Sequence, residues 1–134
     1  MQQNFHHRDK EAQRDSLSEL VIGAAIEVHR NLGAGLLESA YEECLCYELA
    51  QKQITFQRQM ELPIKYKNIE LNINYRIDLV IENGLLLELK SVDKILPIHE
   101  AQLLTYMKLA SLNTGLLINF NVPVLKNGLK RMKL

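Results

Sequence analysis

The first part of the chain has the apolar spacing of α-helices. Ser16-Leu-Ser-Glu19 is a capping-box pattern that predicts the start of a helix, and Gly33 is its predicted stop. After a short joint, a second helix is expected from about Leu36 to Lys52, because apolar residues again recur every three or four positions. Residues 1–15 are polar and mixed in charge, so we expect a flexible N-terminal arm before a single domain over residues 16–134.

The spacing then changes to alternation of apolar and polar residues, which predicts strands with one buried face. The alternating segments are Ile54–Met60, Leu62–Tyr66, Ile69–Tyr75 and Ile77–Ile81, with turns at Lys67-Asn68 and Asn83-Gly84. The segment Leu85–Lys90 is more apolar, so a position nearer the centre of the sheet is expected.

A third helix is predicted after Pro97, from about Ile98 to Ser111, and a short apolar strand follows over residues 116–120. The basic C-terminal tail can add an edge strand. Helices, strands, a helix and a strand in this order predict one α/β domain with a mixed sheet.

Composition and charge restrict the function. The 134 residues include 16 basic and 16 acidic side chains, which excludes attachment to nucleic acid through overall positive charge alone. The last nine residues are locally basic, with Lys126, Lys130, Arg131 and Lys133 and no acid.

The location of the protein is also predicted from composition. No apolar run approaches the roughly 20 residues of a membrane span, and the N-terminus lacks the apolar stretch of a secretory signal. Cys44 and Cys46 lie on nearly opposite faces of the second helix, so they cannot pair readily and are expected to be reduced thiols. These features predict a cytoplasmic protein without a membrane segment.

A group of charged residues on the predicted strands points to metal chemistry. Glu88 and Lys90 lie two positions apart on a strand, so their side chains share a face. A lysine on an apolar strand needs a charged partner, and Asp78 can complete the cluster. Two carboxylates suit Mg²⁺ or Mn²⁺, with the lysine orienting or activating a water. A Glu–Lys pair on a solvated face is the alternative interpretation.

The loop between Asp78 and Glu88 decides whether these carboxylates can share a metal. A two-residue loop, Asn83-Gly84, would put them on opposite faces of the sheet. A three-residue loop over residues 82–84 puts Asp78 directly opposite Glu88. We therefore predict the three-residue loop, with Gly84 at positive φ.

Two helical faces carry further candidates. His99, Gln102 and Tyr106 share one face of the third helix, where a Gln and a Tyr one turn apart can hydrogen-bond a phosphate or steady metal ligands. We predict that this face is turned toward the acid–lysine cluster, with the amide near the acids. Glu38 and Tyr41 share a face at the start of the second helix, and taken alone they fit helix-dipole and core-packing roles.

The motif of Gly35, Glu38 and Tyr41 matches the pattern that names the GxxExxY family, which this sequence resembles from roughly residue 18 to 130. The resemblance includes the segments 32–41, 75–81, 87–90, 99–106 and 115–120. The family is assigned to the PD-(D/E)xK nuclease superfamily, which implies a restriction-endonuclease-like core with a central sheet flanked by helices. Ile77 stands where the superfamily's motif has proline, a position that varies among its members.

The resemblance implies a metal-dependent nuclease that hydrolyses phosphodiester bonds in DNA. The superfamily's motif residues carry over as Asp78, Glu88 and Lys90, its early helix acid as Glu38, and the Gln-xxx-Tyr motif of RecB-like exonucleases as Gln102 and Tyr106. The implied ligands of Mg²⁺ or Mn²⁺ are Glu38, Asp78, Glu88 and the backbone carbonyl of Leu89. Lys90 would act on the water, and the Gln–Tyr pair would steady the phosphate or the ligands.

Two other functions stay open at this point. One is a non-catalytic module that binds nucleic acid or protein on a nuclease-like fold, and the other is an enzyme that acts on small phosphoesters with the same metal. The neutral net charge favours a homodimer or a partner protein that supplies further contacts to DNA. The sequence does not distinguish DNA from RNA, single from double strands, or exonuclease from endonuclease.

Overall fold

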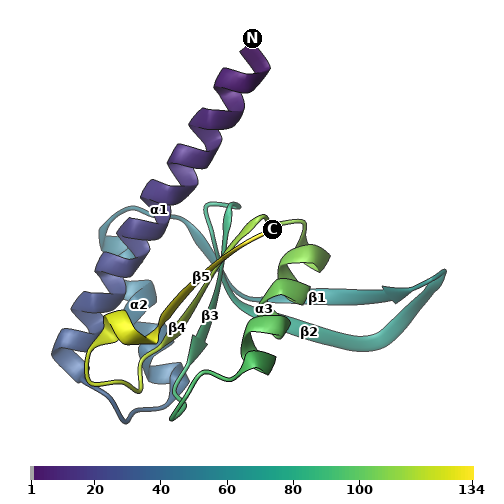
Figure 1. Cartoon of the computed structure of the whole chain (residues 1–134). Coiled ribbons are helices and arrows are strands. Elements are labelled where there is room, and N and C mark those ends of the chain that lie inside the picture. Colours follow the sequence, from purple (N-terminus) through teal and green to yellow (C-terminus); the bar gives the residue numbers. More distant parts are fainter. Residues whose placement is uncertain (1) are drawn as a thin grey trace.

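The structure is a computed structural model that describes residues 2–134 (Figure 1). Helices α1 and α2 come first and a long β-hairpin follows. The elements are α1 Gln2–Leu32, α2 Glu38–Gln51, β1 Phe56–Tyr66, β2 Ile69–Ile81, β3 Leu85–Lys90, α3 Pro97–Ala110, β4 Thr114–Asn119, the 3₁₀ turn η1 Leu125–Gly128 and β5 Leu129–Lys133.

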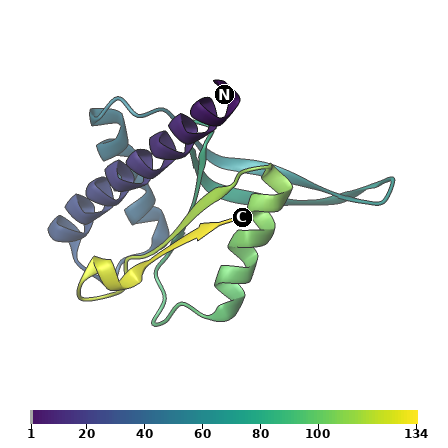
Figure 2. The same ribbon diagram turned by 45° about the horizontal axis from the view of Figure 1, so that its top comes forward.

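Within residues 2–134 the strands form one sheet in the order β1-β2-β3-β4-β5. Strands β3 and β4 are parallel and are joined by α3, and the other neighbours are antiparallel. Helices α1 and α2 cover one face of the sheet and α3 covers the other (Figure 2). The predicted α/β class with a mixed sheet is confirmed.

Two hydrophobic cores fill the spaces between these layers. The larger core lies under α1 and α2, and its members include Val21, Ala24, Leu45, Leu87, Ile118 and Phe120. The smaller core lies under α3, and its members include Leu62, Ile77, Leu86, Leu103, Met107 and Leu117. Among the described residues, none of the helices combines the length and apolar character needed to cross a membrane.

Tyr41 fixes the joint between α1 and α2. Gly33 and Gly35 adopt φ values of +70° and +97°, which glycine tolerates without strain and which turn the chain at the predicted stop of α1. The Tyr41 hydroxyl donates a hydrogen bond to the Gly33 carbonyl at 2.7 Å and accepts the Leu36 N–H at 3.1 Å. Its fully buried ring stacks on Phe120, with centroids 4.4 Å apart. The joint and the first residue of α2 are therefore held in place.

The predicted helix start at Ser16 is wrong, because α1 begins at Gln2 and runs through the predicted arm. Residues 2–22 contain no Gly or Pro, and Gln, Lys, Glu and Ala favour helix, so nothing in this segment interrupts it. A capping box marks a position where a helix can begin. It does not begin there when the preceding residues are themselves helical. The division of the chain into an arm and a single domain stays a prediction.

The four strands predicted between residues 54 and 81 are two long strands, β1 and β2, with the predicted turn at Lys67-Asn68 between them. Pro63 does not end β1, because β1 is an edge strand, where proline is tolerated. The register shifts between Pro63 and Lys65. The far half of this hairpin projects well beyond the body of the molecule (Figure 1).

The predicted three-residue loop between β2 and β3 is confirmed, because Ile81 pairs with Leu85 and Leu79 pairs with Leu87. The predictions for the C-terminal half are also confirmed. Strand β3 is in the middle of the sheet, α3 follows Pro97, and the basic tail forms the edge strand β5.

The conformation predicted for the loop is wrong at Gly84. Positive φ values occur instead at Glu82, with φ 50°, and Asn83, with φ 55°. The Glu82 carboxylate accepts the Thr55 N–H at 3.2 Å and the Thr55 hydroxyl at 2.5 Å, and the Glu82 N–H donates to the Thr55 carbonyl at 3.0 Å. These bonds to the start of β1 stabilise a backbone conformation that glutamate otherwise avoids.

Candidate functional site

Asp78 and Glu88 meet where the ladder between β2 and β3 ends. The backbone pairing ends with Leu79 opposite Leu87, and the next residues along the two strands are Asp78 and Glu88. At this step side chains replace backbone pairing: the Asp78 N–H donates to Glu88 Oε1 at 3.2 Å, and the Leu89 N–H donates to Asp78 Oδ2 at 2.8 Å. Each carboxylate is therefore anchored to the backbone of the neighbouring strand.

Burial raises the pKa of both carboxyl groups. Glu88 is only 6% exposed, and loss of solvation together with repulsion by Asp78 raises the pKa of Glu88 to about 8. Burial also raises the pKa of Asp78, although the Leu89 N–H partly opposes the shift. The charge of Lys90 lowers the pKa of Glu88, but by less than burial raises it. The site thus disfavours negative charge on both carboxyl groups at once unless a positive charge compensates for it.

The raised pKa of Glu88 predicts how the stability of the metal-free protein depends on pH. Between the ordinary value of 4.5 and about 8, folded Glu88 keeps a proton that the unfolded chain has released. Raising the pH through this range therefore lowers the free energy of unfolding. Urea unfolding in EDTA at several pH values measures the slope, and Glu88→Gln is expected to flatten it. An unchanged slope in this variant would contradict the assignment.

Glu38 is the first residue of α2 and lies at the exposed edge of the pair. Its carboxylate accepts the Ser91 N–H at 3.3 Å, and the Ser91 hydroxyl donates to the Leu36 carbonyl at 2.6 Å. These contacts tie the joint before α2 to the end of β3. The charge of Glu38 contributes to the raised pKa of both Asp78 and Glu88, so all three carboxylates interact.

Lys90 is the last residue of β3 and lies on the same face as Glu88. Its backbone carbonyl accepts the Phe120 N–H at 2.9 Å, which fixes the end of the strand. The side chain is half-buried, and among the described side chains and backbone no hydrogen bond or ion pair engages its ammonium group. The lysine therefore places a positive charge beside the carboxylates without being paired to one of them.

Helix α3 brings Tyr106 to the cluster. The ring is largely buried, and after burial itself the charge of Glu88 is the largest cause of the raised pKa of Tyr106, with Asp78 also contributing. Gln102 donates from Nε2 to the Tyr106 hydroxyl at 3.0 Å. The Gln102 amide thus contacts Tyr106, and Tyr106 is close enough to the acidic pair for their charges to affect its pKa.

His99, which the spacing placed on the same helical face, has a role that the sequence did not predict. The ring Nδ1 of His99 accepts the Leu96 N–H at 3.0 Å, and the backbone N–H of His99 donates to the Leu96 carbonyl at 2.9 Å. The side chain therefore caps the first turn of α3.

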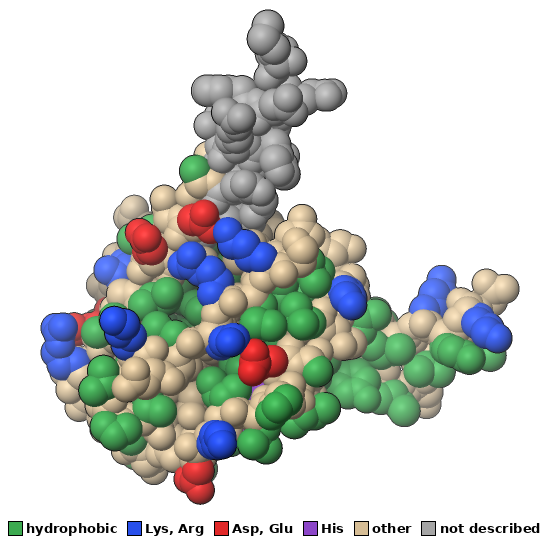
Figure 3. All heavy atoms as spheres, in the orientation of Figure 1, with side chains coloured by type: hydrophobic (Ala, Val, Ile, Leu, Met, Phe, Trp, Pro, Cys, Tyr) green, Lys and Arg blue, Asp and Glu red, His purple; other side chains and the backbone are tan. Residues whose placement is uncertain are grey.

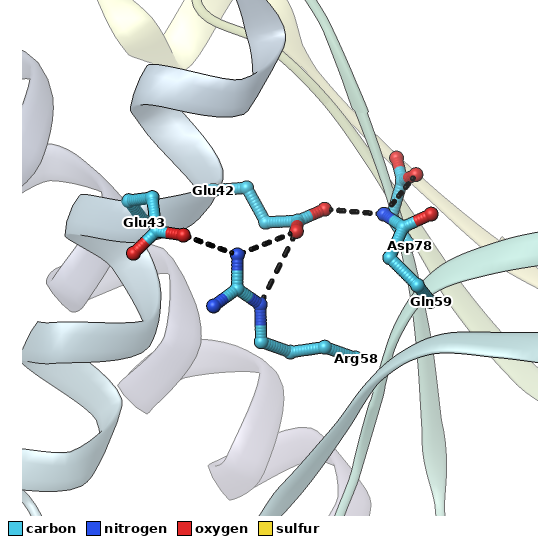
Figure 4. A network of polar contacts seen from close by, with 5 residues as sticks. All are labelled: Glu42, Glu43, Arg58, Gln59 and Asp78. Atoms are coloured by element: carbon cyan, nitrogen blue, oxygen red, sulfur yellow. Dashed lines mark hydrogen bonds and ion pairs between the residues drawn. The ribbon is translucent and has the colours of Figure 1, made fainter.

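Three residues that the sequence analysis missed support Asp78 from the other side (Figure 4). Glu42, on α2, is buried and accepts two hydrogen bonds from Arg58, at 3.2 and 2.9 Å. Gln59 donates to Glu42 Oε1 at 2.7 Å and makes a longer contact of 3.4 Å to Asp78 Oδ1. Arg58 also pairs with the exposed Glu43 at 2.9 Å. This network connects α2, β1 and β2 at the acidic pair.

The network depends on an unusual backbone conformation at Gln59. Adjacent residues of a strand normally point to opposite faces, yet Arg58 and Gln59 both contact Glu42. Gln59 has φ 49°, and the register of β1 passes from Arg58 to Met60 with no pairing at Gln59. This irregularity turns the amide toward Asp78. Glu42 lies one helical turn after Glu38, and this spacing could have identified it as a candidate site residue. The left-handed conformation of Gln59 has no signal in the sequence.

The partner strand changes at the same level. Ile77 packs in the core under α3, whereas Leu79, two residues later, packs in the core under α1 and α2. The alternation of β2 is therefore interrupted at Asp78, opposite the interruption of β1 at Gln59. The acidic pair lies at the point where this side of β2 changes from packing under α3 to packing under α1 and α2.

The residues present fit a hard divalent cation by their chemistry. Asp78 and Glu88 can supply anionic oxygen ligands, and their raised pKa values show that the anionic forms lack the positive charge that a cation would supply. Among the described residues no three His, Cys, Asp or Glu side chains are gathered closely enough to hold a metal as they stand. Glu38 is exposed, so its side chain can change rotamer and add a third carboxylate.

The comparisons agree with this geometry. The family model described as the PD-(D/E)XK nuclease superfamily matches residues 15–132, a range that contains every residue of the cluster and all of the sheet except its last residue, Lys133. Neither the curated proteins nor the solved structures include a significant match. The mixed sheet with helices on both faces is consistent with a restriction-endonuclease-like core. The chain belongs to the PD-(D/E)XK nuclease superfamily.

Proposed function

We propose that this protein is a metal-dependent nuclease that hydrolyses phosphodiester bonds in DNA. The observation that carries the proposal is the Asp78–Glu88 pair, anchored by reciprocal backbone hydrogen bonds with Lys90 on the same face. The residues that would hold Mg²⁺ or Mn²⁺ are Glu38, Asp78, Glu88 and the carbonyl of Leu89. The resemblance to the GxxExxY family supports the same assignment.

Each side chain has a distinct task in this proposal. A bound divalent cation supplies electrostatic stabilisation of the phosphate and a more acidic water. Lys90 holds or helps to deprotonate the attacking water and neutralises charge on the phosphate. Tyr106, held by Gln102, donates from its hydroxyl toward a phosphate oxygen. Gln59 keeps Asp78 in its orientation.

Contacts to DNA outside the site are proposed to come in part from β5. Lys130 pairs with Glu100 at 3.5 Å and Lys133 pairs with Asp15 at 3.0 Å, so part of the basic charge of the tail is already compensated. Binding through the remaining charge would be weak and salt-sensitive. A partner, or a second copy of this chain, would add to the contacts.

A non-catalytic module that binds nucleic acid or protein is the second candidate. The observation that favours it is that three carboxylates are not gathered into a ligand set in the described residues. The two candidates differ in whether the protein cleaves DNA when a divalent metal is added. Incubation of the purified protein with labelled single-stranded DNA, double-stranded DNA and RNA, in Mg²⁺, Mn²⁺ or EDTA, distinguishes them.

Metal binding is tested separately from cleavage with Asp78→Asn. Because a ligand that binds only the folded state stabilises it by mass action, Mg²⁺ or Mn²⁺ is expected to raise the melting temperature of the wild type by several degrees. Asp78→Asn is expected to remove this rise with little loss of fold. Glu61→Gln, which changes an exposed acid, is the control and should behave as the wild type.

An equal metal-dependent rise in Asp78→Asn would show that the metal binds elsewhere. Metal-dependent stabilisation without cleavage of any of the substrates would favour the non-catalytic module. Cleavage that persists in EDTA would contradict the metal-dependent mechanism.

A further inference from the structure

The far half of the β1–β2 hairpin, residues 62–76, exposes an apolar face. This segment is called the arm from here on and is distinct from the predicted N-terminal arm. Along β2 the residues Ile69, Leu71, Ile73 and Tyr75 alternate with polar ones, which is the pattern of a strand with one buried face. They are nevertheless 38–62% exposed, and Tyr66 beside them is 60% exposed. The apolar face of the arm is therefore not covered by its own chain.

A groove of about 550 Å³ separates this face from α3. Its apolar walls are Ile64, Leu71, Ile73 and Tyr75 from the arm and Ile98 and Leu109 from α3. Hydrophobic side chains follow one edge of the projecting arm and continue onto the body, while basic side chains lie toward its far end (Figure 3). The groove and the exposed face of the arm form one continuous surface.

The size of this surface is that of a protein–protein interface. The large exposed apolar side chains are Tyr66, Ile69, Leu71, Ile73 and Tyr75 on the arm and Ile98 and Leu109 on α3. At about 100 Å² each they present roughly 700 Å², close to the ~800 Å² that each partner buries in a standard interface. A two-stranded hairpin without a third layer is only marginally stable, so covering this face also stabilises the arm.

The chemistry of the surface favours protein over nucleic acid. Its residues are mainly aliphatic. The charged side chains of the arm, Lys65, Lys67, Glu70 and Arg76, are separate from the apolar residues that line the groove. Proteins bind nucleic acid chiefly through its phosphates, for which an aliphatic surface offers no partner. Pairing of β1 edges is also disfavoured, because Pro63 and the register shift beside it interrupt that edge. The apolar face, and not the strand edge, is available to a partner.

We propose that the arm and α3 form the interface of a homodimer, in which the arm of each copy lies in the groove of the other. One copy supplies both halves of such a contact, a projecting apolar ribbon and an apolar groove that receives it. Two such contacts related by a two-fold axis close the assembly and cover both arms. The groove is also lined by Gln102 and Tyr106 of the proposed nuclease site, so the arm of the second copy would lie beside that site. The dimer is expected whether or not the protein cleaves DNA.

Sedimentation velocity of the full chain at micromolar concentrations tests the proposal. The wild type is expected to sediment with twice its mass of 15.4 kDa. Ile73→Glu puts a charge in the centre of the interface and is expected to raise the dissociation constant about 100-fold or more. Asn74→Glu, the neighbouring residue on the opposite face of β2, is the matched control and should remain dimeric. Both positions are exposed, and melting temperatures confirm that both variants are folded.

Mixing two variants tests the exchange of arms. Ile98→Lys, on α3, is expected to be monomeric like Ile73→Glu. In a mixed dimer one contact pairs the new glutamate with the new lysine. In the other contact the inserted arm and α3 are unchanged, and only the groove wall at Ile73 carries a substitution. The mixture is therefore expected to dimerise more tightly than either variant alone. A mixture that stays monomeric would contradict arm exchange.

Two other outcomes overturn the proposal. One is a wild type that is monomeric at these concentrations, whether or not its arm binds lipid vesicles or another protein. The other is an equal loss of the dimer in Asn74→Glu and Ile73→Glu.

Discussion

Replacing Lys90 with methionine is expected to reduce metal-dependent cleavage of DNA by about 10²–10⁴-fold, while the metal-dependent rise in melting temperature persists. Methionine keeps the length and apolar body of the side chain but removes the ammonium group beside Glu88. In the proposed mechanism that group acts on the water and the phosphate, and it is not a metal ligand. Binding and catalysis should therefore separate in this variant.

The conditions of this experiment follow from the charges of the site. Lys90 lowers the pKa of Glu88, so its removal raises that pKa further and weakens metal binding near neutral pH. Metal titration and cleavage are therefore both measured over a pH series that extends to about pH 9, and the two proteins are compared where metal binding is saturated. Lys94→Met, an exposed lysine in the following loop, is the matched control and should keep normal cleavage. Normal cleavage by Lys90→Met would remove the lysine from the mechanism.

Tyr41→Ala is expected to lower the free energy of unfolding by about 3–5 kcal/mol, the cost of removing a fully buried aromatic side chain. The ring stacks on Phe120, and its hydroxyl bonds both Gly33 and Leu36. Tyr41→Phe keeps the stacking and loses only the hydroxyl, so a loss of about 1–3 kcal/mol is expected.

Urea unfolding in EDTA measures these changes, and Tyr47→Ala on the same helix is the control. Tyr47 is 62% exposed, so its removal should change the free energy of unfolding by no more than about 0.5 kcal/mol. Equal effects of the two alanine variants would contradict the structural role of Tyr41. If Tyr41→Ala does not fold, the smaller loss in Tyr41→Phe still measures the contribution of the hydroxyl.

The part of the site that could be predicted from sequence depends on local rules. Side chains on a strand repeat every two residues, so the spacing of Glu88 and Lys90 and the length of one loop were sufficient to place Asp78 opposite Glu88. The helical spacing of Gln102 and Tyr106 likewise predicted that they share a face. Their contact of 3.0 Å agrees with that prediction.

The part that could not be predicted breaks those rules or depends on distant packing. Gln59 adopts a left-handed conformation that glycine or asparagine usually occupies, so its contact to Asp78 has no local signal. The alternation of residues 69–75 correctly indicates a strand with one apolar face. It does not indicate whether residues of the same chain bury that face. The capping box at Ser16 failed because a local start signal does not require a helix to begin there.

The two ends of the β1–β2 hairpin differ in how insertions and deletions can accumulate during evolution. One residue added to or removed from the loop over residues 82–84 shifts the pairing of β2 with β3 by one position. Because side chains repeat every two residues, that shift moves Asp78 and Glu88 to opposite faces and separates the acidic pair. The turn at Lys67-Asn68 lies at the far tip of the arm, where residues added in pairs lengthen both strands and leave the pair unchanged. Relatives that keep the acidic pair can therefore vary in length at the tip of the arm. They cannot vary by a single residue in the loop between β2 and β3.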